Sequence, residues 1–335
     1  MGISAYLKEI GRGKEGARSL SREQAADLMG QVLDDQVSDL ELGAFCIAMR
    51  VKGESPDEMA GFIDATESRL QRLPASASPL VVLPSYNGAR KLPLLTPLLG
   101  LLLAREGLPV LIHGAATESA RIHVEPVLAA LGIAALQRVR AVAPGELAYA
   151  PTALLSPSLL RLLEVRRTIG LRNPAHSLVK QLNPCAGDAL RVASYTHPEY
   201  AASMAEVFGR TGASGLLLRG TEGEPVADPR RLPAIRVFHG GALTHQIEAQ
   251  PGSLATLPAL PESTAADAAA NYTRAVLEGR TPVPAPIAQQ VECIVQLHAQ
   301  MQAQMRAQTQ AQTQAQMPVQ TQLSAAPHSQ PHASR

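Results

Sequence analysis

The residues best suited to chemistry in this chain follow a short apolar run at positions 81–83. They form the turn at 84–91, Pro-Ser-Tyr-Asn-Gly-Ala-Arg-Lys, and a later apolar run at 109–112 ends at His113 and Gly114. Where a strand enters such a turn before a helix, backbone N–H groups often hold a phosphate. These turns normally carry several glycines, because the backbone must come close to the phosphate oxygens. This turn has one glycine, a tyrosine and two cations. It therefore predicts a phosphate site whose usual residues have been replaced.

A basic segment between Arg161 and Lys180 adds to this anion-binding character, because it contains five cations and a single acid, Glu164. Phosphate contacts from such residues give salt-dependent, sequence-independent affinity, and a tyrosine can stack on an unpaired base. Basic residues near the N-terminus would add further contacts. We predict that the following residues contact phosphate or nucleic acid: Lys8, Arg12, Lys14, Arg18, Tyr86, Arg90, Lys91, Arg121, Arg166, Arg167, Arg172 and Lys180.

Structural roles remain open for the same residues. The N-terminal cations alternate with glutamates and could form a solvated surface, and arginines on helices often pair with acids. Tyr86 could fill the space that a phosphate would otherwise occupy, and His113 could be a buried structural group. His176 and His197 have no partners at metal-ligand spacing, so we predict no metal site.

The composition limits the class of protein. A chain of 335 residues can hold two modest domains or one large one, and its formal net charge of +1 means that a polyanionic partner would need a local basic surface. Three widely spaced cysteines suit free thiols in a reducing cytosol. The longest apolar run, residues 92–104, contains two prolines and is shorter than the roughly 20 residues of a membrane span. We expect a cytoplasmic protein without a membrane partner.

Three helix starts are marked in the first seventy residues. Ser21, Ser38 and Ser55 are each followed three residues later by glutamine or glutamate, the pattern of a capping box. A proline-flanked stretch of small residues at 73–79 indicates a hinge. These features predict a small helical domain over residues 1–73.

Strands and helices then alternate, which predicts an α/β domain over residues 80–295. Segment 161–184 is expected at the cleft between the two domains. Residues 296–335 are rich in Gln, Ala, Met and Thr, so we expect a tail that is disordered beyond one or two helical turns. Near-continuous apolar runs, typical of a parallel sheet covered on both faces, predict strands at 81–83, 110–112, 215–218 and 235–238.

Several segments resemble the anthranilate phosphoribosyltransferase family, and the resemblance covers roughly residues 3 to 295. Its specific segments are residues 20–55, residues 170–184 ending in Leu-Asn-Pro, residues 196–200 (Thr-His-Pro-Glu-Tyr) and residues 219–223 (Arg-Gly-Thr-Glu-Gly). The chain is similar above all to the YbiB-type branch, which shares residues 8–14 (Lys-Glu-Ile-Gly-Arg-Gly-Lys) and residues 84–91.

The resemblance implies a small N-terminal helical domain, a larger α/β domain with a mainly parallel central sheet, and a homodimer formed through the helices. For this branch it also implies binding of nucleic acid without sequence preference in place of the transferase reaction. Arg166 or Arg167 matches the arginine with which the enzymes hold the anthranilate carboxylate.

The chain departs from the enzymes at three places. They carry Gly-Thr-Gly-Gly-Asp where it has residues 85–89, and Lys-His-Gly-Asn where it has residues 112–115. Their acidic pair, which suits magnesium, falls on Pro225 and Val226, with Glu224 one residue earlier. We interpret the remaining residues as a vestigial donor site, composed of Ser85, Asn87, Gly88, His113 and Gly114.

Two hypotheses follow. The first is a non-catalytic homodimer that binds DNA or RNA without sequence preference and needs no cofactor. The alternative is a phosphoribosyl or glycosyl transferase with a rebuilt donor loop and an unknown substrate, which would use Mg²⁺. The lost glycines and the lost acidic pair favour the first.

Overall fold

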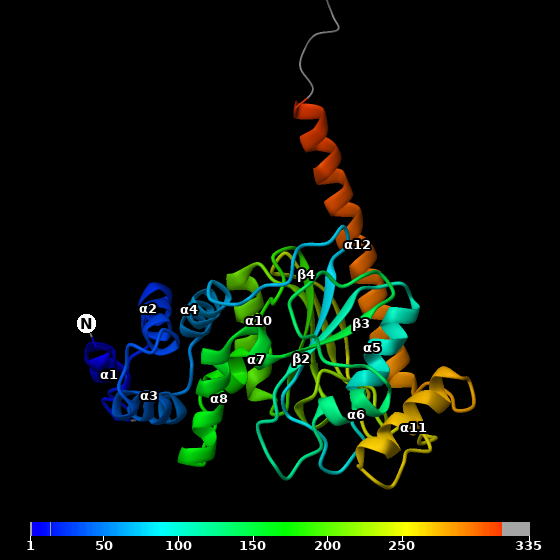
Figure 1. Ribbon diagram of the computed structural model, residues 1–335, viewed down its shortest axis with the longest axis horizontal. Helices are drawn as coiled ribbons and strands as arrows, with labels where there is room; N and C mark the ends of the chain where they lie inside the picture. Colours follow the sequence, from blue (N-terminus) through cyan, green and yellow to red (C-terminus); the bar gives the residue numbers. More distant parts are fainter. Residues whose placement is uncertain (1, 14, 317–335) are drawn as a thin grey trace, which may run out of the picture.

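The computed structural model describes residues 2–13 and 15–316, which form an N-terminal group of helices beside an α/β domain (Figure 1). Ser21, Ser38 and Ser55 each cap a helix as predicted, with the side chain and the backbone of the capping box both hydrogen-bonded. A short first helix precedes these three and was not predicted, because no side chain caps its start. The four helices are α1 (Ser4–Ile10), α2 (Arg22–Leu33), α3 (Asp39–Lys52) and α4 (Pro56–Glu67).

The described strands form one sheet in the order β3-β2-β1-β4-β5-β6-β7, in which the first five are parallel and the last two antiparallel. This confirms the predicted fold class. Three strands were missed, because β3 and β4 are rich in alanine or interrupted by polar residues and β7 is an exposed edge. The strands are β1 (Leu80–Ser85), β2 (Val110–Gly114), β3 (Leu147–Pro151), β4 (Ala189–Tyr195), β5 (Ser214–Arg219), β6 (Ile235–His239) and β7 (Ala242–Ile247).

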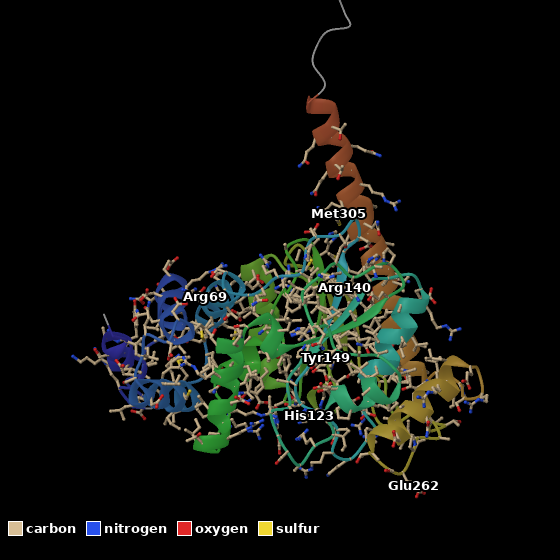
Figure 2. The ribbon with its side chains drawn as sticks, viewed as in Figure 1. Arg69, His123, Arg140, Tyr149, Glu262 and Met305 are labelled. Atoms are coloured by element: carbon tan, nitrogen blue, oxygen red, sulfur yellow. The ribbon has the colours of Figure 1, made fainter. Side chains whose placement is uncertain are left out.

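Helices cover both faces of the sheet, because successive side chains of a strand point to opposite faces. Val81 and Leu83 of β1 pack with α5, α6, α11 and α12, whereas Val82 packs toward α7 on the other face. Figure 2 shows side chains filling these layers, with Tyr149 of β3 in the interior. The helices of this domain are α5 (Thr96–Arg105), α6 (Val124–Ala130), α7 (Thr152–Leu155), α8 (Pro157–Ile169), α9 (Ala175–Leu178), α10 (Glu199–Thr211), α11 (Ala266–Leu277) and α12 (Ala285–Gln316).

Segment 157–182 joins the N-terminal helices to the sheet. Leu159 and Leu162 of α8 and Leu178 of α9 share one buried cluster with Phe45 of α3. In Figure 1, α8 and α10 lie between α1–α4 and the strands. The carboxyl end of β4 lies at a cavity whose other wall is formed by residues of α3 and α4.

The last described helix differs from the expectation for the tail. Helix α12 continues through residues 296–316, where disorder was expected, and projects from the domain in Figure 1. Gln, Ala and Met are good helix formers, and Leu297 and Met301 are buried in the main core, so the first turns of this segment are anchored. Residues 317–335 lie outside the described part. None of the described helices is long and apolar enough to cross a membrane.

Candidate anion-binding cleft

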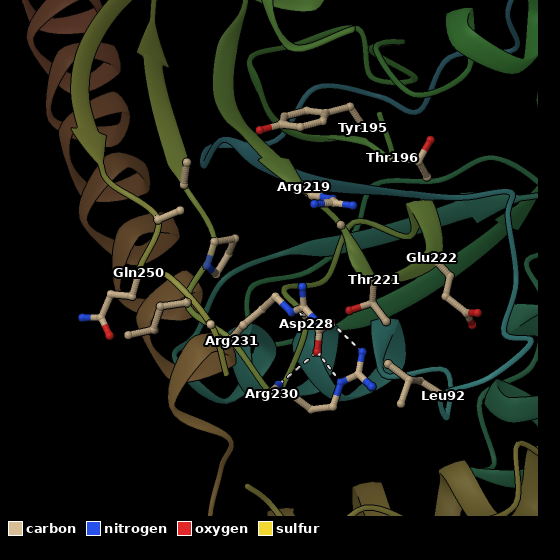
Figure 3. A pocket seen from close by; sticks show the side chains of 16 residues that line it. Leu92, Tyr195, Thr196, Arg219, Thr221, Glu222, Asp228, Arg230, Arg231 and Gln250 are labelled. Carbon is tan, nitrogen blue, oxygen red and sulfur yellow. Dashed lines mark hydrogen bonds and ion pairs between the residues drawn. The ribbon is translucent and has the colours of Figure 1, made fainter. Parts of the chain in front are cut away.

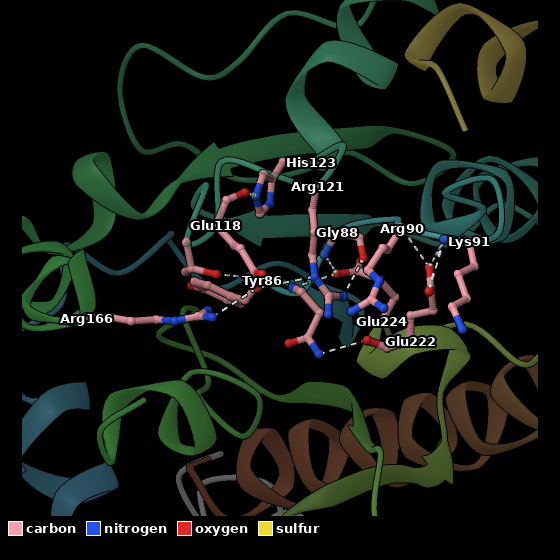
Figure 4. A network of polar contacts seen from close by, with 12 residues as sticks. Tyr86, Gly88, Arg90, Lys91, Glu118, Arg121, His123, Arg166, Glu222 and Glu224 are labelled. Atoms are coloured by element: carbon pink, nitrogen blue, oxygen red, sulfur yellow. Dashed lines mark hydrogen bonds and ion pairs between the residues drawn. The ribbon is translucent and has the colours of Figure 1, made fainter. Parts of the chain in front are cut away.

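The turn after β1 holds a carboxylate of the protein itself in the place where such turns hold phosphate. Oε1 of Glu224 accepts hydrogen bonds from the backbone N–H groups of Asn87 and Gly88, both at 2.8 Å. Oε2 accepts from the hydroxyls of Ser85 at 2.5 Å and Thr96 at 2.9 Å. Glu224 is buried, so its four donors are withdrawn from solvent. Figure 4 shows this carboxylate at the centre of the network.

A second carboxylate closes the rest of the turn. Glu222 accepts from the backbone N–H of Arg90 at 2.7 Å and from that of Lys91 at 3.1 Å, and its carbonyl oxygen accepts from the Asn87 side chain at 2.9 Å. Glu222 has a φ of 53°, a left-handed conformation that is uncommon outside glycine, between Thr221 and Gly223. The turn is thus bound on two sides by the loop that follows β5.

Tyr86 and His113 belong to a buried network beneath this turn. The Thr152 hydroxyl donates to the Tyr86 oxygen at 3.0 Å, and the Tyr86 hydroxyl lies 2.9 Å from Nδ1 of His113. Burial raises the pKa of Tyr86 and lowers the pKa of His113 to about 3. Tyr86 is only 3% exposed, so the prediction that it stacks on a base is wrong for this structure, and the space-filling alternative holds. Gly114 approaches Ser85 so closely that a Cβ would lie 2.0 Å from its carbonyl oxygen.

Three predicted arginines gather around one carboxylate beside the closed turn. Nη2 of Arg166 donates to Glu118 at 3.0 Å, and Nε of Arg121 lies 3.3 Å from the same oxygen, an ion pair without hydrogen-bond geometry. Burial, and then the positive charges of Arg166 and Arg121, lower the pKa of Arg172. Nη1 of Arg166 is buried and has no hydrogen-bond partner among the described residues. Positive charge therefore exceeds negative charge here, and one donor is left for an anion.

Of the other predicted cations, Arg90 and Lys91 have exposed side chains at the rim of this cluster, with no ion pair among the described residues (Figure 4). Arg167 is mostly exposed and pairs with Glu164 at 3.1 Å, as in the surface-pair alternative. Lys180 has a buried side chain whose Nζ donates to the Gly223 carbonyl oxygen at 3.0 Å, and its contact with a phosphate stays a prediction. Burial lowers the pKa of Lys180 to about 8.

The N-terminal cations lie apart from this cluster, on the helical part of the chain. Arg12 pairs with Glu9 at 2.7 Å, which agrees with the solvated-surface alternative. Lys8 and Arg18 are exposed, and Lys14 lies outside the described residues.

A cavity of about 660 Å³ occupies the cleft between α3 and α4 on one side and α9, β4 and α10 on the other. Arg50, Arg172 and Lys180 contribute positive charge to its lining. His176 also lines it, and burial with the nearby Arg172 lowers the pKa of His176 to about 3. The cleft is thus large enough for an organic ligand, and Glu54 and Glu199 line it together with these cations.

Comparison with known proteins decides the family. A family model described as "Glycosyl transferase family, helical bundle domain" matches residues 4–68. The YbiB protein of Escherichia coli strain K12 is 37% identical over 300 residues, which cover 88% of this chain and 93% of YbiB. The chain belongs to the YbiB-type branch of the anthranilate phosphoribosyltransferase-like family.

Enzymes of the wider family are more distant. Anthranilate phosphoribosyltransferase of Thermus thermophilus is 29% identical over 206 residues, covering 60% of this chain and 62% of the enzyme. A crystal structure of the enzyme from the same species matches with a TM-score of 0.67 at 23% identity, covering 87% of both chains. The Saccharomyces cerevisiae enzyme in complex with PRPP and Mg matches with a TM-score of 0.64 at 15% identity, covering 88% of this chain and 89% of the enzyme. These structures share the fold.

The chain's own residues do not fit the donor and metal that this fold accommodates in the enzymes. The nest for a phosphate is filled by Glu224, which also leaves its carboxylate no free oxygen for a cation. Val226 is buried in the main core, and the Pro225 carbonyl oxygen accepts from Gln290 at 2.8 Å. The described residues hold no group of three or more His, Cys, Asp or Glu side chains that could bind a metal.

Sequence reasoning missed the roles of three carboxylates that organise the site. Glu118 lies 48 residues from Arg166 in the chain. Glu222 and Glu224 lie 132 and 137 residues from the backbone amides of Arg90 and Asn87, and only folding brings these groups together. One signal was present in the sequence: Glu224 stands one residue before the lost acidic pair, in the loop after β5. Its role is to replace a phosphate, not to hold a metal.

Replacing Glu224 by alanine should expose the phosphate nest. Each buried donor left without an acceptor costs about 1–3 kcal/mol, so we expect Glu224→Ala to lower the free energy of unfolding by about 3 kcal/mol or more. Because the vacated nest suits an oxyanion, sulfate or phosphate should raise the melting temperature of this variant more than that of the parent. Calorimetry across an anion series measures both effects. Glu262→Ala, on an exposed loop, is the control, and equal anion responses in all three proteins would contradict the assignment.

His113 should make the fold sensitive to acid. The pKa of His113 is lowered in the fold from 6.5 to about 3, so between these values the unfolded chain binds a proton that the folded chain does not. Stability should fall as pH falls through this window, by about 1.4 kcal/mol for each unit of the difference in pKa. Urea unfolding at pH 7, 5 and 4 should show a smaller acid loss for His113→Gln than for the parent. The contribution of His176 is the same in both proteins and cancels in the comparison. Equal losses of stability with acid in the two proteins would contradict a buried, neutral His113.

Proposed function

We propose that this protein binds nucleic acid without sequence preference, through the cations beside the turn at 84–91, and does not transfer phosphoribosyl groups from phosphoribosyl diphosphate. One observation carries the proposal: Glu224 occupies the phosphate nest, while the cations around that nest remain. The Glu224 carboxylate therefore blocks the position that a diphosphate would need. The cations beside this position are still suited to the phosphates of a polymer.

The arrangement of the cations supports a backbone contact rather than base readout. Arg121 and Arg166 pair with Glu118, the charge of Arg172 adds to theirs, and Arg90 and Lys91 extend the positive surface along the turn. Guanidinium groups hold phosphate oxygens through two parallel N–H donors, and such contacts carry no sequence information. Tyr86 is buried, so no aromatic side chain of this turn is available for stacking. The affinity should therefore come from charge and respond strongly to salt.

A homodimer through the helical part belongs to the same proposal. Leu40, Ile47 and Val51 lie on one stripe of α3 and are 84%, 40% and 65% exposed. Beside them an apolar groove of about 400 Å³ runs between α1 and α3, lined by Leu7 and Ala44 among others. Large apolar side chains gathered on one surface mark an interaction site. A second copy would cover this face, and a two-fold axis there would present the cations beside the turn at 84–91 twice.

A phosphoribosyl or glycosyl transferase with a rebuilt donor loop is the second candidate. The cavity of about 660 Å³ supports it, because the cleft is of ligand size and lies between the helical part and the sheet. In such an enzyme the donor would have to bind without the nest that Glu224 fills. Catalytic turnover with a small-molecule donor separates this candidate from the first.

Nucleic-acid binding can be measured by fluorescence anisotropy with a labelled single-stranded oligonucleotide across a salt series. We expect binding whose log affinity falls linearly with log salt. Replacing Arg90 and Lys91 by alanine should weaken binding and reduce the slope by about 1.4, because each lost phosphate contact on a single strand removes about 0.7.

Arg306→Gln is the matched control, because this arginine is exposed on α12 away from the cleft. The variant should bind as the parent does. The proposal fails if the parent does not bind at low salt, and magnesium-dependent consumption of phosphoribosyl diphosphate would favour the transferase.

The dimer is tested by light scattering of the eluting protein. The parent should have twice the chain mass of 35.4 kDa, whereas Ile47→Glu combined with Val51→Glu should have the single-chain mass, because four unpaired carboxylates would be buried at the interface. Leu257→Glu, at an exposed apolar residue elsewhere, should remain dimeric. A monomeric parent, or a dimer unaffected by the double substitution, would rule out this interface.

A further inference from the structure

A second cavity, of about 460 Å³, lies at the carboxyl ends of β4 and β5, beside the turn that carries Glu222. It shares Tyr195 and Thr196 with the cavity of about 660 Å³ but has its own walls. Figure 3 shows the residues that line it. Its volume falls within the range of cavities that bind small organic molecules. None of the twelve predicted phosphate contacts lines it.

Tyr195 and Arg219 form one end of this cavity. They are paired residues at the ends of the parallel strands β4 and β5, so their side chains lie next to each other. In Figure 3 the Arg219 guanidinium lies between the Tyr195 ring and Thr221. Arg219 is exposed and has no ion pair among the described residues. An aromatic face and an available guanidinium are thus placed side by side.

Thr221 provides the decisive polar group. It is 7% exposed, and its Oγ1 has no hydrogen-bond partner among the described residues although it lines the cavity. Its backbone is held, because its N–H donates to Val226 at 2.8 Å and its carbonyl oxygen accepts from Glu224 at 2.9 Å. A buried hydroxyl without a partner is unfavourable. A ligand oxygen would satisfy it.

The opposite wall carries further positive charge. Arg230 holds Asp228 through two hydrogen bonds of 3.0 and 2.9 Å, and Nε of Arg231 lies 3.4 Å from the same carboxylate. The Glu222 carboxylate also lines the cavity but is bound by backbone N–H groups of the neighbouring turn. Three arginines therefore face two carboxylates, and the remaining positive charge belongs to Arg219. Leucine, proline and alanine side chains complete the walls.

We propose that this cavity binds a nucleoside monophosphate. Its phosphate is held by the Arg219 guanidinium and the Thr221 hydroxyl, and its base lies against the Tyr195 ring and the apolar wall. Arginine suits a phosphate because it offers paired donors, and an aromatic ring suits any base. The ligand is either a free mononucleotide or the 5′-phosphorylated end of a strand, since both present the same groups.

The test is a titration of the full-length protein with adenosine 5′-monophosphate, adenosine and inorganic phosphate, followed by saturation-transfer NMR of the ligands. The monophosphate should bind at least about tenfold more tightly than adenosine or phosphate alone, because only it satisfies both parts of the cavity. Arg219→Gln should weaken binding about tenfold or more, and the isosteric Thr221→Val about threefold to tenfold. Arg306→Gln and the Arg90→Ala, Lys91→Ala double variant should bind the monophosphate as the parent does.

Equal affinities for the monophosphate and adenosine, no binding at millimolar concentration, or an unchanged affinity in Arg219→Gln would each overturn the proposal. Comparing single strands with and without a 5′-phosphate distinguishes a free mononucleotide from a strand end as the ligand. A strand end is the ligand if the phosphate strengthens binding to the parent but not to Arg219→Gln. A free nucleotide is the ligand if it binds while the 5′-phosphate has no effect. Failure of general nucleic-acid binding would leave the mononucleotide result standing, so the two proposals are tested separately.

Discussion

The structure depends on one buried carboxylate. Glu224 sits in a nest of two backbone N–H groups and two hydroxyls at the end of β1, where it makes the contacts that a phosphate makes in turns of this geometry. A buried carboxylate is stable only when its oxygens are fully hydrogen-bonded. The turn after β1 and the loop after β5 therefore hold each other in place.

Neighbouring features follow from this constraint. Lys180 is buried because it donates to the peptide next to Glu224 and compensates the negative charge. Glu222 takes an uncommon left-handed conformation so that the same loop can bind the rest of the turn. Beneath the turn, Tyr86 fills space and binds His113. Arg121 and Arg166 carry positive charge beside the turn, where they pair with Glu118.

The sequence predicted the parts that depend on local pattern. Ser21, Ser38 and Ser55 marked helix starts correctly, because a capping box is satisfied within four residues. The buried strand at 81–83 was evident from its apolar run. Strand β4 was missed because Arg191 and Ser194 interrupt that pattern, and they are tolerated only because other parts of the fold supply partners. The segment after residue 296 was judged by composition, whereas buried Leu297 and Met301 anchor its first turns in α12.

The α/β class, the helical N-terminal part, the family, and the loss of the glycines and acidic pair that a diphosphate and its metal require can all be recognised in the sequence alone. The residues that take the place of the lost glycines and acidic pair become evident only in the folded structure. It turned Tyr86 and Lys180 inward, gathered Arg121 and Arg166 on Glu118, and placed Glu224 in the nest. Contacts between residues more than a hundred positions apart, such as Glu224 with Gly88, leave no periodic trace in a single chain, because hydrogen-bond geometry and burial arise only when the strands are assembled.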